Sequence, residues 1–378
     1  MIYDLIVVGS GSIGAATAWY AKQAGLQVLM IDAHHPPHKQ GSHHGETRLI
    51  RYAYSDGEHY LPLLLDSKQR WLDLEKISQC RLLTQCGVLH LAAEDSPTIR
   101  QKKRIAQQWQ LNCLSLSAED IHQRWLGLTP PAHFSGLLEQ DAGYLHCSKA
   151  VQVLIKLCHD AGCAQLFNSP VMAINQHSGL QQVKTAQGIF QAHRLVISAG
   201  TQVRQLLPSL PVQPVRKVFT WFQADGRYGE SAHFPAFTID LGQEGQFYGF
   251  PAQNASLKLA RHDGGQPLTV AQQPAAFGQI PSDGSECLPV LRQFLPGVGG
   301  CLNGESCLYD NSPDQDFIID TLPDNPHCLL ITGLSGHGFK FALTLGHIAS
   351  EFAGGQVLSD YVSHFSLRRF NESATNLR

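Results

Sequence analysis

An almost uninterrupted hydrophobic run lies at the start of the chain. Residues 3–8 form an apolar run that ends at the glycines of Gly-Ser-Gly-Ser-Ile-Gly, residues 9–14. Apolar residues then recur at helical spacing over 13–24, and a second apolar run over 27–31 leads to Asp32. Short apolar runs closed by glycine are typical of parallel strands buried on both faces. The pattern therefore predicts a strand, a helix ended by Gly25 and a second strand.

Beyond residue 60, the pattern alternates between amphipathic helices and short strands. Helices are expected at 61–77, 97–109, 118–125 and 148–162. The first of them should bury an apolar face made of Leu64, Leu65, Trp71, Leu72, Leu74 and Ile77. Strands are expected at 87–91, 134–138, 164–168, 171–175, 181–185, 188–192 and 193–200, with the third and fourth forming a pair. Alternation over 212–224 and 246–250 favours antiparallel strands with one solvated face.

A second strand, glycine turn and helix pattern appears near the end of the chain. Residues 328–332 are apolar and lead into glycines at positions 333, 336 and 338. We therefore expect an α/β fold in which a Rossmann-like nucleotide-binding domain is assembled from segments 1–80, 144–212 and 310–378. Segments 81–143 and 213–309 are expected to form a substrate domain with a mixed or antiparallel sheet.

Composition narrows the function classes. The chain has 378 residues, 43% of them hydrophobic and 16% charged, with a formal net charge of −3, so neither nucleic acid nor a membrane surface is an expected partner. No leader peptide and no apolar run of membrane-spanning length is visible, which favours a cytoplasmic protein. The ten cysteines form no C-x-x-C pair, and no spacing of histidines and carboxylates predicts a metal site.

The first glycine motif carries the clearest chemistry. In G-x-G-x-x-G, Gly9 makes a tight turn, Gly11 lets the backbone approach a pyrophosphate, and Gly14 lets helix and strand pack closely. Asp32, at the end of the next strand, is placed to accept hydrogen bonds from a ribose. Both FAD and NAD enzymes use this motif. The second glycine turn favours FAD, because its backbone N–H groups suit a ring that becomes anionic on reduction.

Four longer segments resemble the monomeric sarcosine oxidase family over nearly the whole chain. They are G-S-H-H-G-E-T-R-L-I-R (41–51), L-K-L-A-R-H (257–262), C-L-Y-D-N-S-P-D-Q-D-F-I-I-D (307–320) and G-L-S-G-H-G-F-K (333–340). The resemblance implies a monomer with an FAD-binding domain of the glutathione-reductase-related type. Residues 214–228 favour the branch of the family whose substrate carries an indole ring.

The resemblance also implies roles for particular residues. Cys307 matches the cysteine that forms a thioether with the 8α-methyl carbon of the flavin, whereas Cys301 does not match and is expected to be structural. Arg51 and Lys340 match the pair that binds the substrate carboxylate, a role suited to charge-assisted hydrogen bonds. Lys258 matches the lysine that promotes reaction with oxygen, where a fixed cation stabilises a superoxide-like anion.

Further matches are implied around the flavin and the substrate. Arg48 and His262 match catalytic positions near the flavin, although a surface histidine remains an alternative for His262. Tyr248 and Tyr309 match tyrosines that line the substrate pocket. The remaining matches are expected to contact the cofactor; they are His44, Thr47, Gly336, His337 and Gly338.

Together these features predict FAD-dependent oxidative demethylation of a secondary N-methyl amino acid with an indole side chain. The products would be the amino acid, formaldehyde and hydrogen peroxide, with water and O₂ consumed. Either hydride transfer or an amine adduct could break the C–H bond. A sarcosine oxidase is the nearest alternative, and an NAD-dependent dehydrogenase or a non-catalytic flavin-binding protein is more remote.

Overall fold

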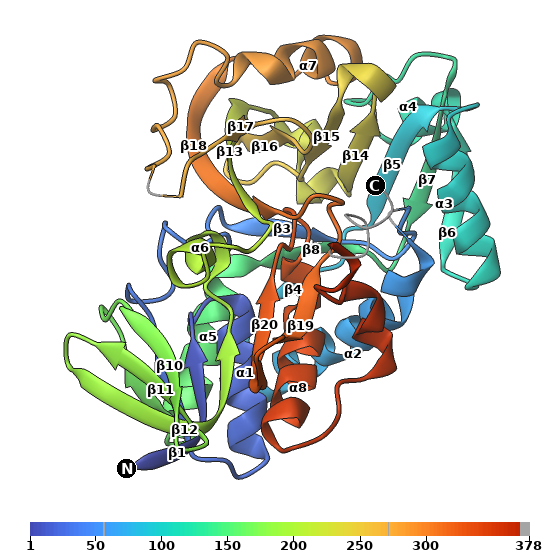
Figure 1. The fold of residues 1–378 in the computed structure, drawn as a ribbon. Helices are drawn as coiled ribbons and strands as arrows, with labels where there is room; N and C mark the ends of the chain where they lie inside the picture. Colours follow the sequence, from blue (N-terminus) through green and yellow to red (C-terminus); the bar gives the residue numbers. More distant parts are fainter. Residues whose placement is uncertain (56, 271, 371–378) are drawn as a thin grey trace, which may run out of the picture.

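The computed structural model describes residues 1–55, 57–270 and 272–370, so residues 371–378 of the predicted nucleotide-binding segment lie outside the described part. Two large β-sheets occupy opposite halves of the molecule, and a small sheet lies between them (Figure 1). The small sheet is antiparallel and consists of β3 (Thr47–Ile50), β4 (Leu83–Thr84) and β8 (Gly143–His146).

The first large sheet is built around the N-terminal strand. Its strands are β1 (Ile2–Val8), β2 (Val28–Ile31), β9 (Ala164–Leu166), β10 (Ala173–His177), β11 (Leu180–Thr185), β12 (Gly188–Ile197), β19 (Ile318–Leu322) and β20 (Asn325–Thr332). β1 lies parallel to both β2 and β12, and β9 extends the sheet beyond β2. The strands predicted from residues 3–8 and 27–31 therefore belong to the parallel part of this sheet, which also contains the antiparallel strands β10, β11 and β19.

Two predictions about this sheet were wrong. The strands expected at 188–192 and 193–200 are one strand, β12, because its first half pairs with β11 and its second half pairs with β20. The segments 164–168 and 171–175 do not pair with each other, since β9 joins β2 and β10 joins β11. Apolar patterns reveal strands, but they do not reveal which strand is the neighbour.

Helices cover one face of the first sheet. They are α1 (Ser12–Gln23), α2 (Leu61–Ser78), α5 (Cys147–Asp160) and α8 (Ala342–Ala353). Alternate residues of β1 enter different cores: Leu5 and Val7 pack with these helices, whereas Ile6 and Val8 pack on the opposite face near the short helix α6 (Val203–Leu206). This strand is buried on both faces, as its continuous apolar run predicts.

The expected apolar face of α2 was partly wrong. Leu64, Trp71 and Leu74 are buried, but Leu65 and Ile77 are exposed. The buried positions follow the 3.6-residue period, and Leu65 and Ile77 lie off that stripe.

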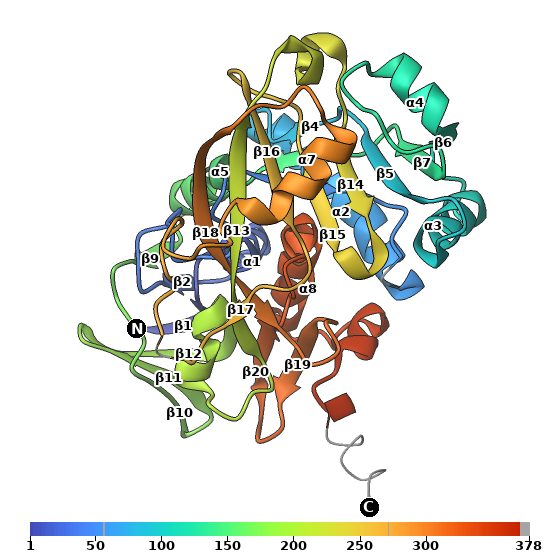
Figure 2. The ribbon, with the colours of Figure 1, turned by 90° about the horizontal axis from the view of Figure 1, so that it is seen from above.

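The second large sheet is mixed, as predicted. Its strands are β5 (Val88–Ala93), β6 (Cys113–Ser117), β7 (Phe134–Glu139), β13 (Gln213–Gln223), β14 (Ala236–Asp240), β15 (Gln246–Gly249), β16 (Ser256–Arg261), β17 (Gln266–Pro267) and β18 (Cys301–Asn311). Only the β5–β14 pairing is parallel among the pairings described for this sheet. The helices beside it are α3 (Pro97–Gln108), α4 (Ala118–Arg124) and α7 (Leu288–Phe294), of which α7 covers one face (Figure 2).

The division into two domains remains a prediction, although each large sheet draws its strands from separate parts of the chain. Within the described residues, no helix is both long enough and apolar enough to cross a bilayer.

A glycine sets the distance between α1 and α8. A Cβ atom at Gly346 would lie 2.5 Å from the Cβ of Ala16 and 2.8 Å from its carbonyl carbon. We expect Gly346→Ala to lower the free energy of unfolding by about 1–3 kcal/mol through overpacking. Gly354→Ala, at the end of the same helix, is the matched control and should change it little, because a Cβ there meets nothing closer than 3.4 Å. Denaturant unfolding of both variants measures the difference, and equal effects would contradict this account.

Candidate active site

The first glycine turn leaves no room for side chains at two of its three glycines. Gly9 has φ +91°, and a Cβ atom there would overlap the backbone of Ser198, while a Cβ at Gly14 would overlap the carbonyl of Gly9. At Gly11 the nearest atom is 3.4 Å away, in the ring of His43. No side chain caps the start of α1. Its N–H groups are therefore open to an anion.

A large cavity of about 1290 Å³, including its open mouth, follows this turn. It is lined by Gly9, Gly11, Asp32, Arg48, Pro170, Gly200, Gln202, Tyr309, Gly336, Gly338 and Phe339, among others. Asp32 accepts hydrogen bonds from the backbone of Ser10 (2.6 Å) and His34 (2.9 Å), and His38 lies 3.3 Å away. Burial opposes ionisation of Asp32, but these hydrogen bonds outweigh it and lower its pKa. A large cavity with a helix N-terminus and an ionised acid fits a dinucleotide.

The second glycine turn closes the other side of this cavity. Gly333 and Gly336 have positive φ angles, and a Cβ atom at Gly336 would overlap the ring of Tyr309. Asp310 holds the turn from the neighbouring β18: its carboxylate accepts hydrogen bonds from the Gly333 N–H (2.9 Å) and the Thr332 hydroxyl (3.1 Å). The turn therefore depends on a buried carboxylate from the other large sheet.

A second cavity, of about 910 Å³, adjoins the first. Arg48, Tyr309, Gly336 and Phe339 line both cavities. The guanidinium of Arg48 donates to the carbonyls of Thr47 (2.9 Å), Ser42 (3.0 Å) and His44 (2.5 Å). Arg48 is thus fixed at the junction by neutral acceptors, and its charge is available to both cavities.

Arg51 and Lys340 come from distant segments and line the second cavity together. The guanidinium carbon of Arg51 lies 4.4 Å from the centre of the Tyr54 ring, and the Lys340 ammonium lies 5.1 Å from the same centre. Lys340 also donates to the carbonyl of His337 (2.6 Å). Two cations against one ring create a positive region in this wall, which attracts an anion.

His337 lines the second cavity but not the first. Its Nε2 lies 3.1 Å from the carbonyl of Gln315, and its Nδ1 lies 2.6 Å from the Tyr54 hydroxyl. Because a carbonyl can only accept, we assign the proton to Nε2, and Nδ1 then accepts from Tyr54. The ring also stacks on Phe317.

Tyr248 and His262 complete the wall near Tyr309. The ring of His262 lies 6.4 Å from that of Tyr248 and 5.9 Å from that of Tyr309. Burial raises the pKa of Tyr248 to about 12, and it also raises that of Tyr309. Both phenols are therefore neutral at pH 7.

Lys258 lies behind the junction, outside the lining of either cavity. Its ammonium donates to the carbonyl of Gly45 and to the carbonyl and hydroxyl of Thr47 (3.3 and 3.2 Å), and it lies 4.5 Å from the centre of the Phe219 ring. Burial, with help from the charge of Arg48, lowers its pKa to about 7. A cation buried with neutral acceptors is costly unless a negative partner is near.

Cys307 is buried in β18, directly opposite Lys217 of β13. It packs with Phe219, Ala260 and Tyr309 and is not part of the lining of either cavity. Burial raises the pKa of its thiol, and the charges of Arg48, Lys258 and Lys217 oppose this increase. The cationic surroundings that an activated thiol needs are present.

The other predicted residues lie around this centre. Gly14 lies beneath the first turn, Thr47 binds Lys258, and His44 pairs with Glu305 at 2.7 Å. None of these three lines either cavity.

Sequence reasoning missed a buried polar group in the second cavity. His90, which lines the cavity, lies between Thr238 (2.7 Å) and Glu139 (2.6 Å), and burial lowers its pKa to about 4. Lys102, from α3, lines the same wall. The available signal was a histidine in the middle of the apolar strand 88–93.

Comparisons with known proteins identify the family and the fold. Residues 4–352 match the FAD dependent oxidoreductase (DAO) family. The chain is 50% identical over 372 residues, 98% of its length, to the complete N-methyl-L-tryptophan oxidases of Citrobacter koseri and Salmonella typhimurium. Its fold is similar to that of NikD, an unusual amino acid oxidase (TM-score 0.84, 22% identity, 96% of each chain). It is also similar to glycine oxidase from Geobacillus kaustophilus (TM-score 0.82, 16% identity, 97% of this chain and 98% of the other).

The buried carboxylate of Asp310 gives a test that depends on pH. Burial raises its pKa from an ordinary value of 3.8 to about 6, so the folded protein binds this proton more tightly than the unfolded chain. The contribution of this proton to the free energy of unfolding is fully present below about pH 4 and is lost as the pH rises through 6. A shift of about two units corresponds to about 3 kcal/mol.

We therefore expect Asp310→Asn to gain stability relative to the unsubstituted protein as the pH increases from about 4 to about 7. Urea unfolding at several pH values measures the difference in free energy of unfolding between the variant and the unsubstituted protein. A packing defect caused by the substitution would change this difference by the same amount at every pH. The exposed Asp324→Asn variant is the control and should follow the unsubstituted protein. A difference for Asp310→Asn that does not change with pH would refute the assignment.

Proposed function

Since the chain belongs to the FAD dependent oxidoreductase family, we propose that it removes the N-methyl group of N-methyl-L-tryptophan. The products would be L-tryptophan, formaldehyde and hydrogen peroxide, formed with water and O₂. The main support is the cavity lined by Arg51 and Lys340, which adjoins the dinucleotide cavity at Arg48 and Tyr309. We also propose that the protein acts as a cytoplasmic monomer.

The positive wall of the second cavity suits the substrate carboxylate. Arg51 can bind both oxygens of a carboxylate, and Lys340 can add a third charge-assisted hydrogen bond. Their shared contact with Tyr54 keeps the two cations close together. Binding at this wall would direct the amine of the substrate towards the junction of the two cavities.

The volume of the second cavity favours a large side chain. The cavity, which measures about 910 Å³ with its open mouth included, is lined by Leu91, Ile99 and Phe247 as well as by polar residues. An indole ring can bury its area against this apolar lining, whereas sarcosine has no side chain to do so. Sarcosine oxidation is therefore the second candidate.

FAD supplies the two-electron oxidation and the reaction with O₂. The protein orients the substrate and controls charge around the reacting atoms. His90 and Tyr248 are both neutral at pH 7, so neither adds charge to the wall of the substrate cavity. We propose that the neutral amine is the reactive form and that the enzyme needs no general base.

Arg48 and Lys258 are proposed as catalytic cations, with His262 beside them. Both cations are hydrogen-bonded to carbonyl or hydroxyl oxygens, so their charge can stabilise negative charge that develops on the cofactor or on oxygen. A fixed cation is already oriented, which avoids a reorganisation cost during the reaction.

Cys307 is proposed as the point of covalent attachment. Its Sγ would form a thioether with the 8α carbon of FAD, with loss of the S–H proton and of one hydrogen from the 8α methyl group. The two electrons released would be taken up by the flavin and passed to O₂. The nearby charges of Arg48, Lys258 and Lys217 would favour the thiolate that this step needs. His44, Thr47 and the glycines of both turns are proposed to contact the cofactor, together with Asp32 and His337.

Turnover tests the proposed substrate. We expect peroxide and formaldehyde in equal amounts from N-methyl-L-tryptophan, and a lower kcat/KM with sarcosine. Arg51→Met should reduce kcat/KM by about 10- to 100-fold, since a hydrogen bond to a charged group contributes about 1.5–3 kcal/mol. Arg100→Met, an exposed arginine of α3, is the control. A colourless protein that requires NAD, or faster sarcosine turnover, would refute the proposal.

Acid precipitation tests the covalent bond. We expect the yellow colour to remain on the denatured polypeptide and to be released into solution from Cys307→Ser. Cys301→Ser removes an exposed thiol of the same strand and should retain the colour. Colour retained by Cys307→Ser would place the attachment elsewhere.

Stopped-flow kinetics can separate the two half-reactions of Lys258→Met. Removing this cation should slow the return of flavin absorbance with O₂ on the order of 100-fold or more. The rate at which substrate reduces the flavin should change much less, because Lys258 does not line the substrate cavity. Lys184→Met, an exposed lysine, is the control. Equal slowing of both half-reactions would contradict a specific role towards oxygen.

A further inference from the structure

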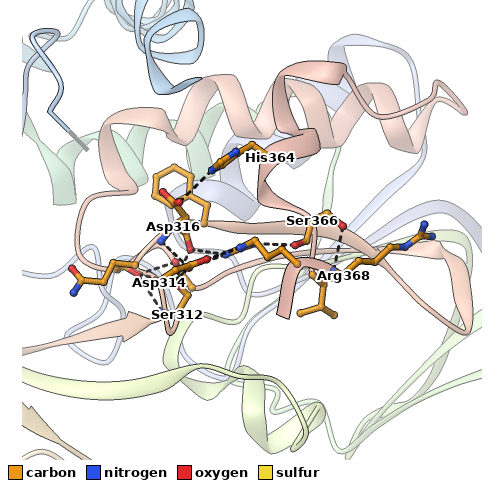
Figure 3. Close-up of polar contacts among 12 residues, drawn as sticks. Ser312, Asp314, Asp316, His364, Ser366 and Arg368 are labelled. Carbon is orange, nitrogen blue, oxygen red and sulfur yellow. Dashed lines mark hydrogen bonds and ion pairs between the residues drawn. The ribbon is translucent and has the colours of Figure 1, made fainter. Parts of the chain in front are cut away.

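Three segments far apart in the sequence meet around Asp316, behind the wall of the substrate cavity. They are the 3₁₀ helix η1 (Glu58–Tyr60), the connection between β18 and β19, and the 3₁₀ helix η8 (Asp360–Phe365). His59, Asp316 and His364 each offer one possible ligand atom, and these atoms lie within 4.8 Å of one another. Figure 3 shows the ring of His364 directed at the carboxylate of Asp316.

The distances in this cluster suit a tetrahedral metal ion. The Nε2 atom of His59 lies 3.6 Å from one carboxylate oxygen of Asp316, and the Nε2 atom of His364 lies 3.3 Å from the other. Ligands bound to zinc at about 2.1 Å are about 3.4 Å apart in a tetrahedron. Both nitrogen–oxygen separations are close to this value, each to a different oxygen of the carboxylate, so the Asp316 carboxylate faces both imidazoles.

The arrangement leaves a nitrogen without a hydrogen bond. The Nε2 atom of His59 is buried, and among the described residues it has no hydrogen-bond partner. The ring of His59 also stacks on that of His364, with centroids 3.8 Å apart and planes 29° apart. Two protonated imidazoles at this distance would repel each other, which favours the neutral form that binds metal. Because the lone pairs lie in the ring planes, the half-exposed ring of His364 has to turn out of this stack for both Nε2 atoms to bind one ion.

Surrounding hydrogen bonds hold Asp316 in place. The Tyr60 hydroxyl donates to the Asp316 carboxylate (2.8 Å). The backbone N–H of Asp316 donates to the Asp314 carboxylate (3.1 Å). Arg369 donates to the Asp316 carbonyl (3.2 Å) and pairs with Asp314 (2.7 Å). A ligand fixed by such outer contacts loses less entropy when it binds a metal.

We propose that His59, Asp316 and His364 form a binding site for one divalent transition-metal ion such as zinc or cobalt. Two imidazoles and one carboxylate favour these ions over calcium and magnesium, which prefer all-oxygen sites. His364 is half exposed, so the ion can enter from solvent and can bind water as a fourth ligand.

The bound ion would join η8 to η1, next to the substrate cavity. Tyr60 connects the two sites, since its hydroxyl binds Asp316 and its ring lies 5.5 Å from that of the cavity-lining His337. His59, Asp316 and His364 do not line either cavity, so metal binding at this site can be measured without enzyme turnover.

Cobalt titration of the flavin-loaded enzyme, purified without a polyhistidine tag and stripped of metal, tests the proposal. Bound Co²⁺ should give d–d bands at longer wavelengths than the flavin, and equilibrium dialysis with Zn²⁺ should give one ion per chain. His364→Ala and Asp316→Asn should each weaken binding by on the order of tenfold or more. His364 lies at the surface, so its variant is expected to fold.

The control is His347→Ala, which removes a histidine paired with Glu351 in α8, outside the cluster. It should bind Co²⁺ like the unsubstituted enzyme. Three results would overturn the proposal: unchanged affinity in His364→Ala and Asp316→Asn, an equal loss in His347→Ala, or intense thiolate-to-cobalt charge-transfer bands that place the ion on cysteine.

Discussion

The contact between the end of β18 and the C-terminal glycine turn is the constraint on which the site depends. Tyr309 occupies the space where a side chain at position 336 would lie, and the next residue, Asp310, binds the backbone of Gly333. This contact joins the end of a strand of the second large sheet to the turn that follows β20 of the first. The dinucleotide cavity and the second cavity share a boundary as a result.

A second feature of the site is a group of buried basic side chains that bind neutral oxygens. Arg48, Lys258 and Lys217 are largely buried, and the acceptors described for their hydrogen bonds are carbonyl and hydroxyl oxygens. A carboxylate partner would cancel their charge, whereas neutral oxygens fix the side chains and leave the field intact. The desolvation cost is visible in the lowered pKa values of Lys258 and Lys217. A cofactor that becomes anionic when it accepts electrons would offset this desolvation cost, because its negative charge would attract the buried cations.

Much of the fold followed from local patterns. The glycine spacing after β1 predicted the turn that leaves no room for a side chain at Gly9 and Gly14, and the length of the apolar runs predicted parallel strands. Strand partners were harder to predict, as β12 shows by pairing with β11 along one half and β20 along the other. Register and neighbours depend on long-range packing, which hydrophobic periodicity does not encode.

By itself, the sequence determined the nucleotide-binding turn, the mixed second sheet and the family resemblance, because glycine spacing and apolar runs report local backbone requirements. Only the tertiary structure decided which side chains meet. The family resemblance predicted that Arg51 and Lys340 act as a pair, but the ring of Tyr54 that they share is visible only in the structure. His90, which joins their cavity from a buried strand, was not predicted at all. His59, Asp316 and His364 likewise converge from three segments with no common motif. Convergence of this kind is set by how layers pack, so no single stretch of sequence contains it.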